Sequence, residues 1–367
     1  MKVGIPREIK RHEYRVAATP VDIAAYVRAG HQVLIEKSAG QSAGFPDDGY
    51  RRAGAILAES AEEVYGQAEM IVKVKEPQPQ EFGLLRAGQI LYGYLHLAAE
   101  PAVAHALIER GVSAVAYETI QLDDGTLPCL VPMSEIAGRL ATHEGAKLLE
   151  KPSGGRGVLL GGVPGVLPAN VGILGGGTVG TNAARMAVGL GANVTITDVS
   201  HKRLIYLDDV FNSTVHTLFS TKENVEYLLE TCDLIIGAVL IPGASAPRLI
   251  RREHIKRMKP GSVIVDVAVD QGGCTEMTRP TTHDDPIFTV DGVILYCVAN
   301  MPGAVPVTST KALTNQTLRY GLEIANKGLA RAAGENPAIK LGVNVHEGRI
   351  GHPAVAESLN LPYRNDL

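Results

Sequence analysis

Short apolar runs alternate with amphipathic stretches through the first third of the chain. Runs rich in valine and isoleucine and bounded by polar residues or glycine predict strands, whereas apolar positions three or four residues apart predict helices. The predicted strands are Lys2–Ile5, Gln32–Glu36, Met70–Val74, Ile90–Leu95 and Ser113–Tyr117, and the predicted helices between them are Val21–Ala29, Ala61–Gln67 and Pro101–Arg110. This alternation predicts a parallel sheet covered by helices.

A second alternating region follows a long amphipathic stretch, Ser134–Lys151, which predicts a helix with Ser134 as its N-cap. The glycine-rich Gly154–Gly165 is predicted to be a loop, with a phosphate cradle as the alternative. Further helices are predicted at Asn224–Glu230 and Pro247–Met258. Six strands are predicted, enough for a complete doubly wound nucleotide-binding sheet: Val171–Leu174, Asn193–Thr197, Val215–Phe219, Asp233–Leu240, Ser262–Val269 and Gly292–Val298.

The last part of the chain predicts a helix over Ser309–Lys327 and then a short tail to Leu367. A chain of 367 residues exceeds the size at which one hydrophobic core stops growing. We therefore predict two doubly wound, Rossmann-like α/β domains with parallel sheets, linked by the two long helices. The first comprises residues 1–128 and 306–367 and is expected to bind the substrate, and the second comprises residues 129–305 and is expected to bind the cofactor.

The most informative segment is Val171–Asp198, VGILGGGTVGTNAARMAVGLGANVTITD. It reads as a strand, a glycine turn, a helix and a second strand, which is the start of a dinucleotide-binding unit. Gly175 would make the turn, Gly177 would let a pyrophosphate approach the backbone, and Gly180 would let the helix pack on the strand. Asp198 would accept hydrogen bonds from a ribose diol and repel a 2′-phosphate, which favours NAD over NADP. A glycine turn in another kind of doubly wound sheet is the alternative.

Composition narrows the possible partners. Hydrophobic residues make up 45% of the chain and charged residues 20%, and the formal net charge is −4, so nothing indicates nucleic-acid binding. The basic residues Arg251, Arg252 and Lys256 have the spacing of a solvated helix face.

Four widely separated cysteines predict neither a zinc site nor a disulfide framework. Cys232 and Cys297 lie in apolar runs and are expected to be buried thiols. We expect no metal site, because no ligands cluster at metal-binding spacing. Met1 leads directly into a strand, and no stretch has the length of a membrane span. We therefore expect no signal peptide, no membrane partner and a cytoplasmic location.

Polar residues that follow parallel strands indicate where a ligand would bind, since the carboxyl ends of such strands line the binding crevice. In the first region these residues are Lys75, His96 and either Arg7 or Arg15. In the second they are Asp198, Ser220 and Asp270.

These residue types suit hydride transfer at a carbon that carries an amino group and a carboxylate. Arg15 could hold a carboxylate through two parallel hydrogen bonds, and Lys75 could polarise a carbonyl. His96 could transfer the proton near neutral pH, and Asp270 could orient an ammonium group or a water molecule. Each also has a simpler interpretation: Lys75 and Arg15 as solvated charges, His96 as a hydrogen-bonded core residue, and Asp270 as a turn cap.

The chain also resembles the alanine dehydrogenases along essentially its whole length. The matching segments are Gly4–Glu8 (GIPRE), Glu13–Val16 (EYRV), Val72–Pro77 (VKVKEP), Tyr94–Leu97 (YLHL), Asp266–Gly273 (DVAVDQGG), Pro280–His283 (PTTH) and Val298–Ala304 (VANMPGA). The resemblance implies reversible oxidative deamination of L-alanine to pyruvate and ammonium with NAD as cofactor. It also implies a homo-oligomer, typically a hexamer, and an active-site cleft between the two domains.

The resemblance further implies a role for each matching residue. Arg15 and Lys75 would bind the substrate, and His96 and Asp270 would be the catalytic pair. The implied cofactor-binding residues are Ser134, Gly175, Gly177, Thr178, Val179, Gly180, Asp198, Arg203, Ser220, Val239, Leu240, Val267, Asp270, Arg279, Val298, Asn300 and Met301.

Three other functions remain open at this point. The NAD-binding part of a nicotinamide nucleotide transhydrogenase shares the architecture, and a lysine-pathway dehydrogenase of the saccharopine type would need space for a long side chain. A non-catalytic NAD-binding protein would not need His96 or Lys75 beside its ligand.

Overall fold

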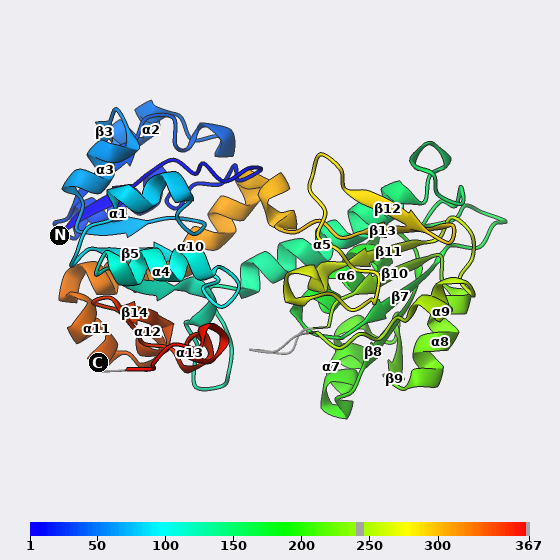
Figure 1. Cartoon of the computed structure of the whole chain (residues 1–367). Helices are drawn as coiled ribbons and strands as arrows, with labels where there is room; N and C mark the ends of the chain where they lie inside the picture. The colour runs from blue at the N-terminus through cyan, green and yellow to red at the C-terminus, as the bar shows by residue number, and fades with distance from the viewer. Residues whose placement is uncertain (240–245, 365–367) are drawn as a thin grey trace. The chain divides into compact units, whose positions relative to one another are not determined.

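A computed structural model describes residues 1–239 and 246–364 of the chain (Figure 1). It divides into two compact units, one made of Met1–Met133 with Gly303–Leu367 and the other of Ser134–Pro302. Each is an α/β unit built on one mixed sheet in which parallel pairs predominate, so the predicted α/β class is confirmed.

The first unit contains an eight-stranded sheet in the order β15-β14-β6-β5-β4-β1-β2-β3. Its strands are β1 (Lys2–Ile5), β2 (Gln32–Glu36), β3 (Ile56–Ala58), β4 (Met70–Val72), β5 (Ile90–Gly93), β6 (Ser113–Ala116), β14 (Val343–His346) and β15 (Arg349–Ile350). Its helices are α1 (Pro20–Arg28), α2 (Asp47–Arg52), α3 (Ala61–Gln67), α4 (Pro101–Glu109), α10 (Pro306–Lys327), α11 (Leu329–Glu335), α12 (Pro337–Gly342) and α13 (Pro353–Leu359).

The prediction of a purely parallel first sheet is wrong at one edge. Strand β14 is antiparallel to β6, and β15 is antiparallel to β14. Both strands come from the region beyond Lys327, which the sequence predicted to be a short tail. Their apolar side chains complete the sheet's core, since Val345 and Ile350 are buried in the same cluster as residues of β4, β5 and β6.

The second unit contains a seven-stranded sheet in the order β12-β13-β11-β10-β7-β8-β9. Its strands are β7 (Asn170–Leu174), β8 (Asn193–Asp198), β9 (His216–Phe219), β10 (Leu234–Gly237), β11 (Val263–Asp266), β12 (Ile287–Val290) and β13 (Val293–Tyr296). The helices are α5 (Val131–Leu148, which starts just before this unit), α6 (Thr178–Gly189), α7 (His201–Phe211), α8 (Lys222–Thr231) and α9 (Arg252–Ile255). The unpredicted strand β12 pairs antiparallel with β13 at one edge.

Two helix predictions in this unit need correction. Helix α5 begins at Val131, so Ser134 lies in its first turn and is not the N-cap. Most of the predicted helix Pro247–Met258 is not helical, and only α9 forms within it. The reason is that Ile250 forms a parallel bridge with Thr275, which commits its backbone to a neighbouring segment.

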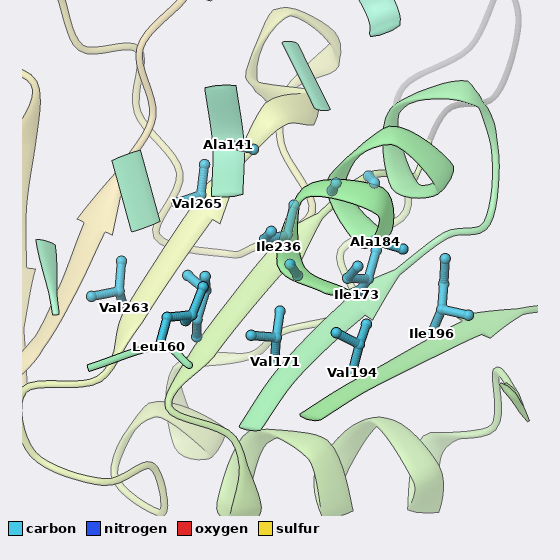
Figure 2. Close-up of a cluster of buried hydrophobic side chains, with 14 of the residues drawn as sticks. Ala141, Leu160, Val171, Ile173, Ala184, Val194, Ile196, Ile236, Val263 and Val265 are labelled. Atoms are coloured by element: carbon cyan, nitrogen blue, oxygen red, sulfur yellow. The ribbon is translucent and has the colours of Figure 1, made fainter. Parts of the chain in front are cut away.

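Alternate residues of each central strand face opposite sides of this sheet. Leu234 and Ile236 belong to a buried cluster with residues of α5, α6 and α7, part of which Figure 2 shows. Ile235 belongs to a second cluster with residues of α8 and α9. Burial on both faces explains why β10 is an unbroken apolar run, as is typical of parallel sheets.

Two expectations about the chain's chemistry can be compared with this fold. All four cysteines are buried free thiols, as was predicted for Cys232 and Cys297. Within the ranges that the structure describes, no helix combines the length and the apolar character needed to cross a membrane.

Truncating a central core side chain tests the packing of the second unit. Ile236 is completely buried in β10, so Ile236→Ala is expected to lower the free energy of unfolding by about 2–5 kcal/mol through lost contacts and a new cavity. Denaturant titration measures the change. The control is Leu159→Ala, at an exposed position of the same unit, and an equal loss in both variants would contradict the assignment of the core.

Candidate active site

Four neighbouring parallel strands of the first unit, in the order β6-β5-β4-β1, end at one edge of the sheet. Lys75 follows β4, and His96 follows β5. Arg15 lies in the segment after β1, and Glu118 in the 3₁₀ helix η3 (Tyr117–Thr119) after β6. This is the edge at which open parallel sheets bind their ligands.

Lys75 and His96 are direct neighbours. The Nζ atom of Lys75 lies 3.4 Å from Nε2 of His96. The imidazole ring stacks on the ring of Tyr94, with 6.0 Å between centroids and 8° between planes. The hydroxyl group of Tyr94 donates to the carbonyl oxygen of Cys129 at 2.5 Å, which fixes this supporting ring. The site therefore presents an ammonium group and an imidazole side by side.

The backbone of His96 has a left-handed conformation with φ of +47°. Such a conformation is uncommon for a residue other than glycine and persists only where the surroundings hold it. Here the partly buried carboxylate of Glu118 accepts hydrogen bonds from the N–H groups of His96 at 2.6 Å and Leu95 at 3.2 Å. The same Oε1 atom lies 4.0 Å from Nδ1 of His96. Glu118 therefore holds the backbone of His96 and lies near its ring.

The electrostatic environment keeps His96 neutral. Burial lowers the pKa of His96 well below its usual value, and the positive charges of Lys75, Lys10 and Arg15 lower it further. Because that pKa lies well below 6.5, the ring is uncharged at neutral pH and can accept a proton. Burial has the opposite effect on Glu118, whose pKa is raised.

Arg15 is buried and bound to Glu13. Its Nε donates to Oε1 of Glu13 at 2.7 Å, and Nη2 donates to Oε2 at 2.5 Å. Its third nitrogen, Nη1, lies 3.0 Å from Sδ of Met133. The Nε and Nη2 groups, one of the two pairs with which Arg15 could hold a substrate carboxylate, thus already bind Glu13, whereas Nη1 faces Met133.

Arg7, the alternative to Arg15, lies in a different environment. Its side chain is more than half exposed, and its Nε lies 3.8 Å from a carboxylate oxygen of Glu36. The positive charge of Arg15, but not that of Arg7, is among the charges that lower the pKa of His96.

The glycine turn of the second unit has the geometry that its sequence predicted. Gly175 has φ of +101°, as the tight turn requires. A Cβ atom on Gly180 would lie 1.9 Å from the carbonyl oxygen of Gly175, so only glycine lets α6 pack here. A Cβ atom on Gly177 would meet nothing within 4 Å, which leaves open space beside the N-terminus of α6. Thr178 and Val179 begin that helix, where N–H groups favour an anion.

Asp198 and Arg203 both bind this turn. Oδ2 of Asp198 accepts from the N–H of Gly176 at 2.8 Å, and Oδ1 accepts from the N–H of Ser200 at 2.8 Å. Arg203 donates to the carbonyl oxygen of Gly176 and, at 2.7 Å, to the hydroxyl oxygen of Thr181. The carboxylate that was predicted to bind ribose therefore also holds the turn in place.

The other predicted cofactor-binding residues fall into two groups. Several follow strand ends of the second unit: Ser220 after β9, Val239 after β10, Val267 after β11, and Val298, Asn300 and Met301 after β13. The remainder lie elsewhere: Ser134 is in the first turn of α5, and Arg279 is exposed with its guanidinium 4.5 Å from the ring centroid of Phe288 on β12. Leu240 lies outside the described residues.

Asp270 is exposed in the 3₁₀ helix η5 (Val267–Gln271), directly after β11. The fully buried carboxylate of Asp266 holds this loop by accepting from the N–H groups of Ala268 at 3.1 Å and Cys274 at 2.9 Å. It also accepts from the hydroxyl group of Thr278. Burial raises the pKa of Asp266 above its usual value.

The sequence predicted the site side chains near the strand ends but missed the carboxylates that hold those side chains or their backbone in place. Glu13, Glu118 and Asp266 were absent from the predicted site, although each contacts a residue or loop within it. A signal existed for Glu118, which directly follows the predicted strand Ser113–Tyr117. Asp266 instead lay inside the predicted strand Ser262–Val269, which in the structure ends at Asp266. Nothing in the local pattern showed that their oxygens accept backbone N–H groups from other segments.

Comparison with known proteins identifies the family. Residues 4–137 match the model of the alanine dehydrogenase/PNT N-terminal domain, and residues 141–353 match that of the C-terminal domain. The alanine dehydrogenase of Methanococcus maripaludis is 56% identical over 364 residues, which cover 99% of this chain and 98% of that protein.

Solved structures give the same result. An L-alanine dehydrogenase superposes with a TM-score of 0.95 at 50% identity, covering 98% of this chain and 99% of that one. A transhydrogenase from Sinorhizobium meliloti superposes with a TM-score of 0.81 at 25% identity, covering 96% and 100%. With both domain models matched in order and full-length relatives at this identity, the chain belongs to the alanine dehydrogenase/PNT family.

Proposed function

We propose that the chain is an L-alanine dehydrogenase, which converts L-alanine, NAD and water reversibly to pyruvate, ammonium and NADH with release of a proton. One observation carries the proposal: a neutral imidazole and an ammonium group lie 3.4 Å apart at the ligand-binding edge of the first sheet. Its support from the comparisons is that relatives named alanine dehydrogenase match the chain over nearly its whole length. A protein that only bound a dinucleotide would not need this pair.

The second unit is the proposed binding domain for NAD. The open space at Gly177 and the N-terminus of α6 fit a pyrophosphate, and the carboxylate of Asp198 fits a ribose diol. When bound, NAD supplies the acceptor for the hydride that leaves Cα of alanine. The negative charge of Asp198 would repel a 2′-phosphate, so we propose NAD rather than NADP as the cofactor.

The first unit is the proposed substrate domain. Arg15 and Lys75 provide positive charge for the substrate carboxylate, and the ammonium group of Lys75 also stabilises the carbonyl oxygen as it develops. The two hydrogen bonds from Arg15 to Glu13 hold the guanidinium in place before any substrate binds. Preorganised charge of this kind contributes most where water is excluded.

Proton transfer is the proposed role of His96. Hydride loss leaves an iminium carbon, which water attacks while the C=N π electrons move to nitrogen, and the neutral imidazole accepts a proton from that water. The resulting carbinolamine then breaks its C–N bond, which releases the nitrogen as ammonium and leaves the carbonyl group of pyruvate. The adjacent Lys75 ammonium favours the neutral form of the ring between turnovers. Asp270, which η5 presents to solvent, is the proposed second catalytic residue.

We also propose that the chain forms a homo-oligomer, with a hexamer as the expected size. The support is the family resemblance described above, and sedimentation velocity measures the state directly.

The activity itself is tested by NADH absorbance with the purified protein. L-Alanine with NAD is expected to give turnover, whereas glycine and L-lysine, or NADP in place of NAD, give far less. Absence of turnover with alanine while NADH still binds would refute the proposed reaction and favour a transhydrogenase-like or sensor function.

His96→Asn tests the acid/base group while keeping a residue that tolerates the left-handed backbone. We expect the turnover number for alanine to fall by about 10²–10⁴-fold, as for loss of a general base, with NADH affinity retained. Fluorescence titration with NADH is the control. Near-normal turnover in this variant would remove His96 from the mechanism.

Lys75→Gln tests the electrostatic link between the two side chains. Loss of the neighbouring positive charge is expected to raise the pKa of His96 toward its usual value, because that charge now lowers it. The pH dependence of diethyl pyrocarbonate modification at His96, followed by mass spectrometry, measures the shift. Lys37→Gln, at an exposed lysine paired with Glu59, is the control. An unchanged midpoint in Lys75→Gln would contradict the link.

A further inference from the structure

A cluster of buried charges in the first unit has no part in the mechanism above. Nζ of Lys73 lies 3.2 Å from Oε2 of Glu8 and 2.9 Å from Oε1 of Glu81. The side chains of Lys73, Glu8 and Glu81 are at most 3% exposed, and the hydroxyl group of Tyr65 also donates to Glu81 at 2.9 Å. Charges buried this deeply require partners on every side.

The two carboxylates of this cluster differ in their second contact. Oε1 of Glu8 accepts a hydrogen bond from the backbone N–H of Val74 at 2.6 Å. Glu81 instead accepts from the N–H of Gln78, within its own turn. Glu8 therefore bonds to the residue immediately before Lys75, and Glu81 does not.

Strand order explains how Glu8 reaches this position. Strands β1 and β4 are parallel neighbours, with Val3 opposite Met70 and Gly4 opposite Ile71. Glu8 follows the end of β1, and Val74 follows the end of β4. The two strands end at the same edge of the sheet, so the carboxylate of Glu8 can accept a hydrogen bond from the N–H of Val74, where the chain leaves β4.

We infer that Glu8 is a positioning residue for Lys75: its buried carboxylate holds the Val74 N–H group and the Lys73 ammonium, and so places the Lys75 ammonium beside His96. The inference rests on the function proposed above for Lys75. With Lys73 held in the interior, the segment can turn Lys75 toward the ligand edge, where its Nζ lies 3.4 Å from His96. Glu118 holds the backbone of His96 in the same way from the other side, after β6.

The charge of Glu8 adds a second readout. Burial raises the pKa of Glu8 to about 7. The charge of Lys73 and the hydrogen bond from the Val74 N–H lower the pKa of Glu8, whereas the charges of Glu13 and Glu81 raise it. The charge of Glu8 in turn acts on Arg15 and Tyr65. Below about pH 7 the carboxylate is protonated, and Lys73 loses one of its two counter-charges. Activity that depends on Lys75 should therefore fall as pH decreases through 7, whereas His96 titrates well below that range.

Matched variants separate positioning from general stability. Glu8→Ala and Glu81→Ala each remove one carboxylate from Lys73, but only Glu8→Ala frees the N–H group of Val74. In Glu8→Ala we expect kcat/KM for L-alanine to fall by about 10–100-fold, as for a small displacement of a reacting group, with KM for NAD unchanged. Glu81→Ala is expected to keep a kcat/KM near that of the unaltered enzyme. Equal losses in the two variants would overturn the inference.

Glu8→Gln keeps the volume and an acceptor oxygen, so it covers the case in which Glu8→Ala does not fold. We expect it to lose the acidic limb of the pH profile of kcat/KM near pH 7 that the unaltered enzyme shows. An acidic limb that persists unchanged in Glu8→Gln would refute the role of Glu8.

Hydrogen exchange at the Val74 amide, resolved by fragmentation mass spectrometry, gives the same test without any substrate. Faster exchange in Glu8→Ala than in Glu81→Ala supports the inference, and equal exchange overturns it. Because this readout does not depend on alanine turnover, failure of the inference and failure of the proposed function remain distinguishable.

Discussion

Hydrogen bonds between backbone N–H groups and carboxylates that are buried or partly buried hold the segments that carry the candidate catalytic residues. A parallel strand that leaves its sheet exposes N–H groups that no neighbouring strand can accept, and buried N–H groups need a partner. Glu8 accepts from Val74, Glu118 from Leu95 and His96, and Asp266 from Ala268 and Cys274. Bonds between N–H groups and ionised oxygens are short and strong, so they define geometry better than contacts between neutral groups.

Burying these carboxylates carries an electrostatic consequence. Burial raises the pKa values of Glu8, Glu118 and Asp266. Backbone N–H groups and cations such as Lys73 oppose that rise, so the charged form persists only where these partners are correctly placed. At the carboxyl ends of the first unit's strands, the ionisation of these carboxylates therefore depends on the positions of their partners. The segments that carry Lys75 and His96 are held by hydrogen bonds to Glu8 and Glu118.

The second unit obtains its geometry chiefly from steric constraints. Gly180 lies against the carbonyl group of Gly175, and no side chain fits there. The helix that follows packs its alanines on the sheet, with Ala183, Ala184 and Ala187 completely buried. Close packing brings the helix N-terminus to the strand end, where Asp198 and Arg203 hold the turn from the other side. The N–H groups at this helix N-terminus favour an anion.

Apart from β3, β12, β14 and β15 at or next to the sheet edges, local patterns in the sequence determined the strands, along with most helices and the glycine turn, because each depends on neighbours a few residues away. They also placed Lys75, His96 and Asp270 at strand ends, since the carboxyl end of a strand can be read from where its apolar run stops. Strand ends themselves were overestimated at Val74 and Leu95. The apolar pattern continues there, but Glu8 and Glu118 take the N–H groups that a longer strand would have used.

Only the tertiary structure decided the contacts that join distant segments. Ile250 pairs with Thr275 instead of extending a helix, and β14 returns from the end of the chain to lie beside β6. The sequence did not predict that Glu13 binds Arg15, although the two lie only two residues apart, because an acidic residue in a loop is usually solvated. Which carboxylate is buried, and which N–H group it accepts, depends on strand order, and strand order is a property of the folded sheet rather than of any one segment.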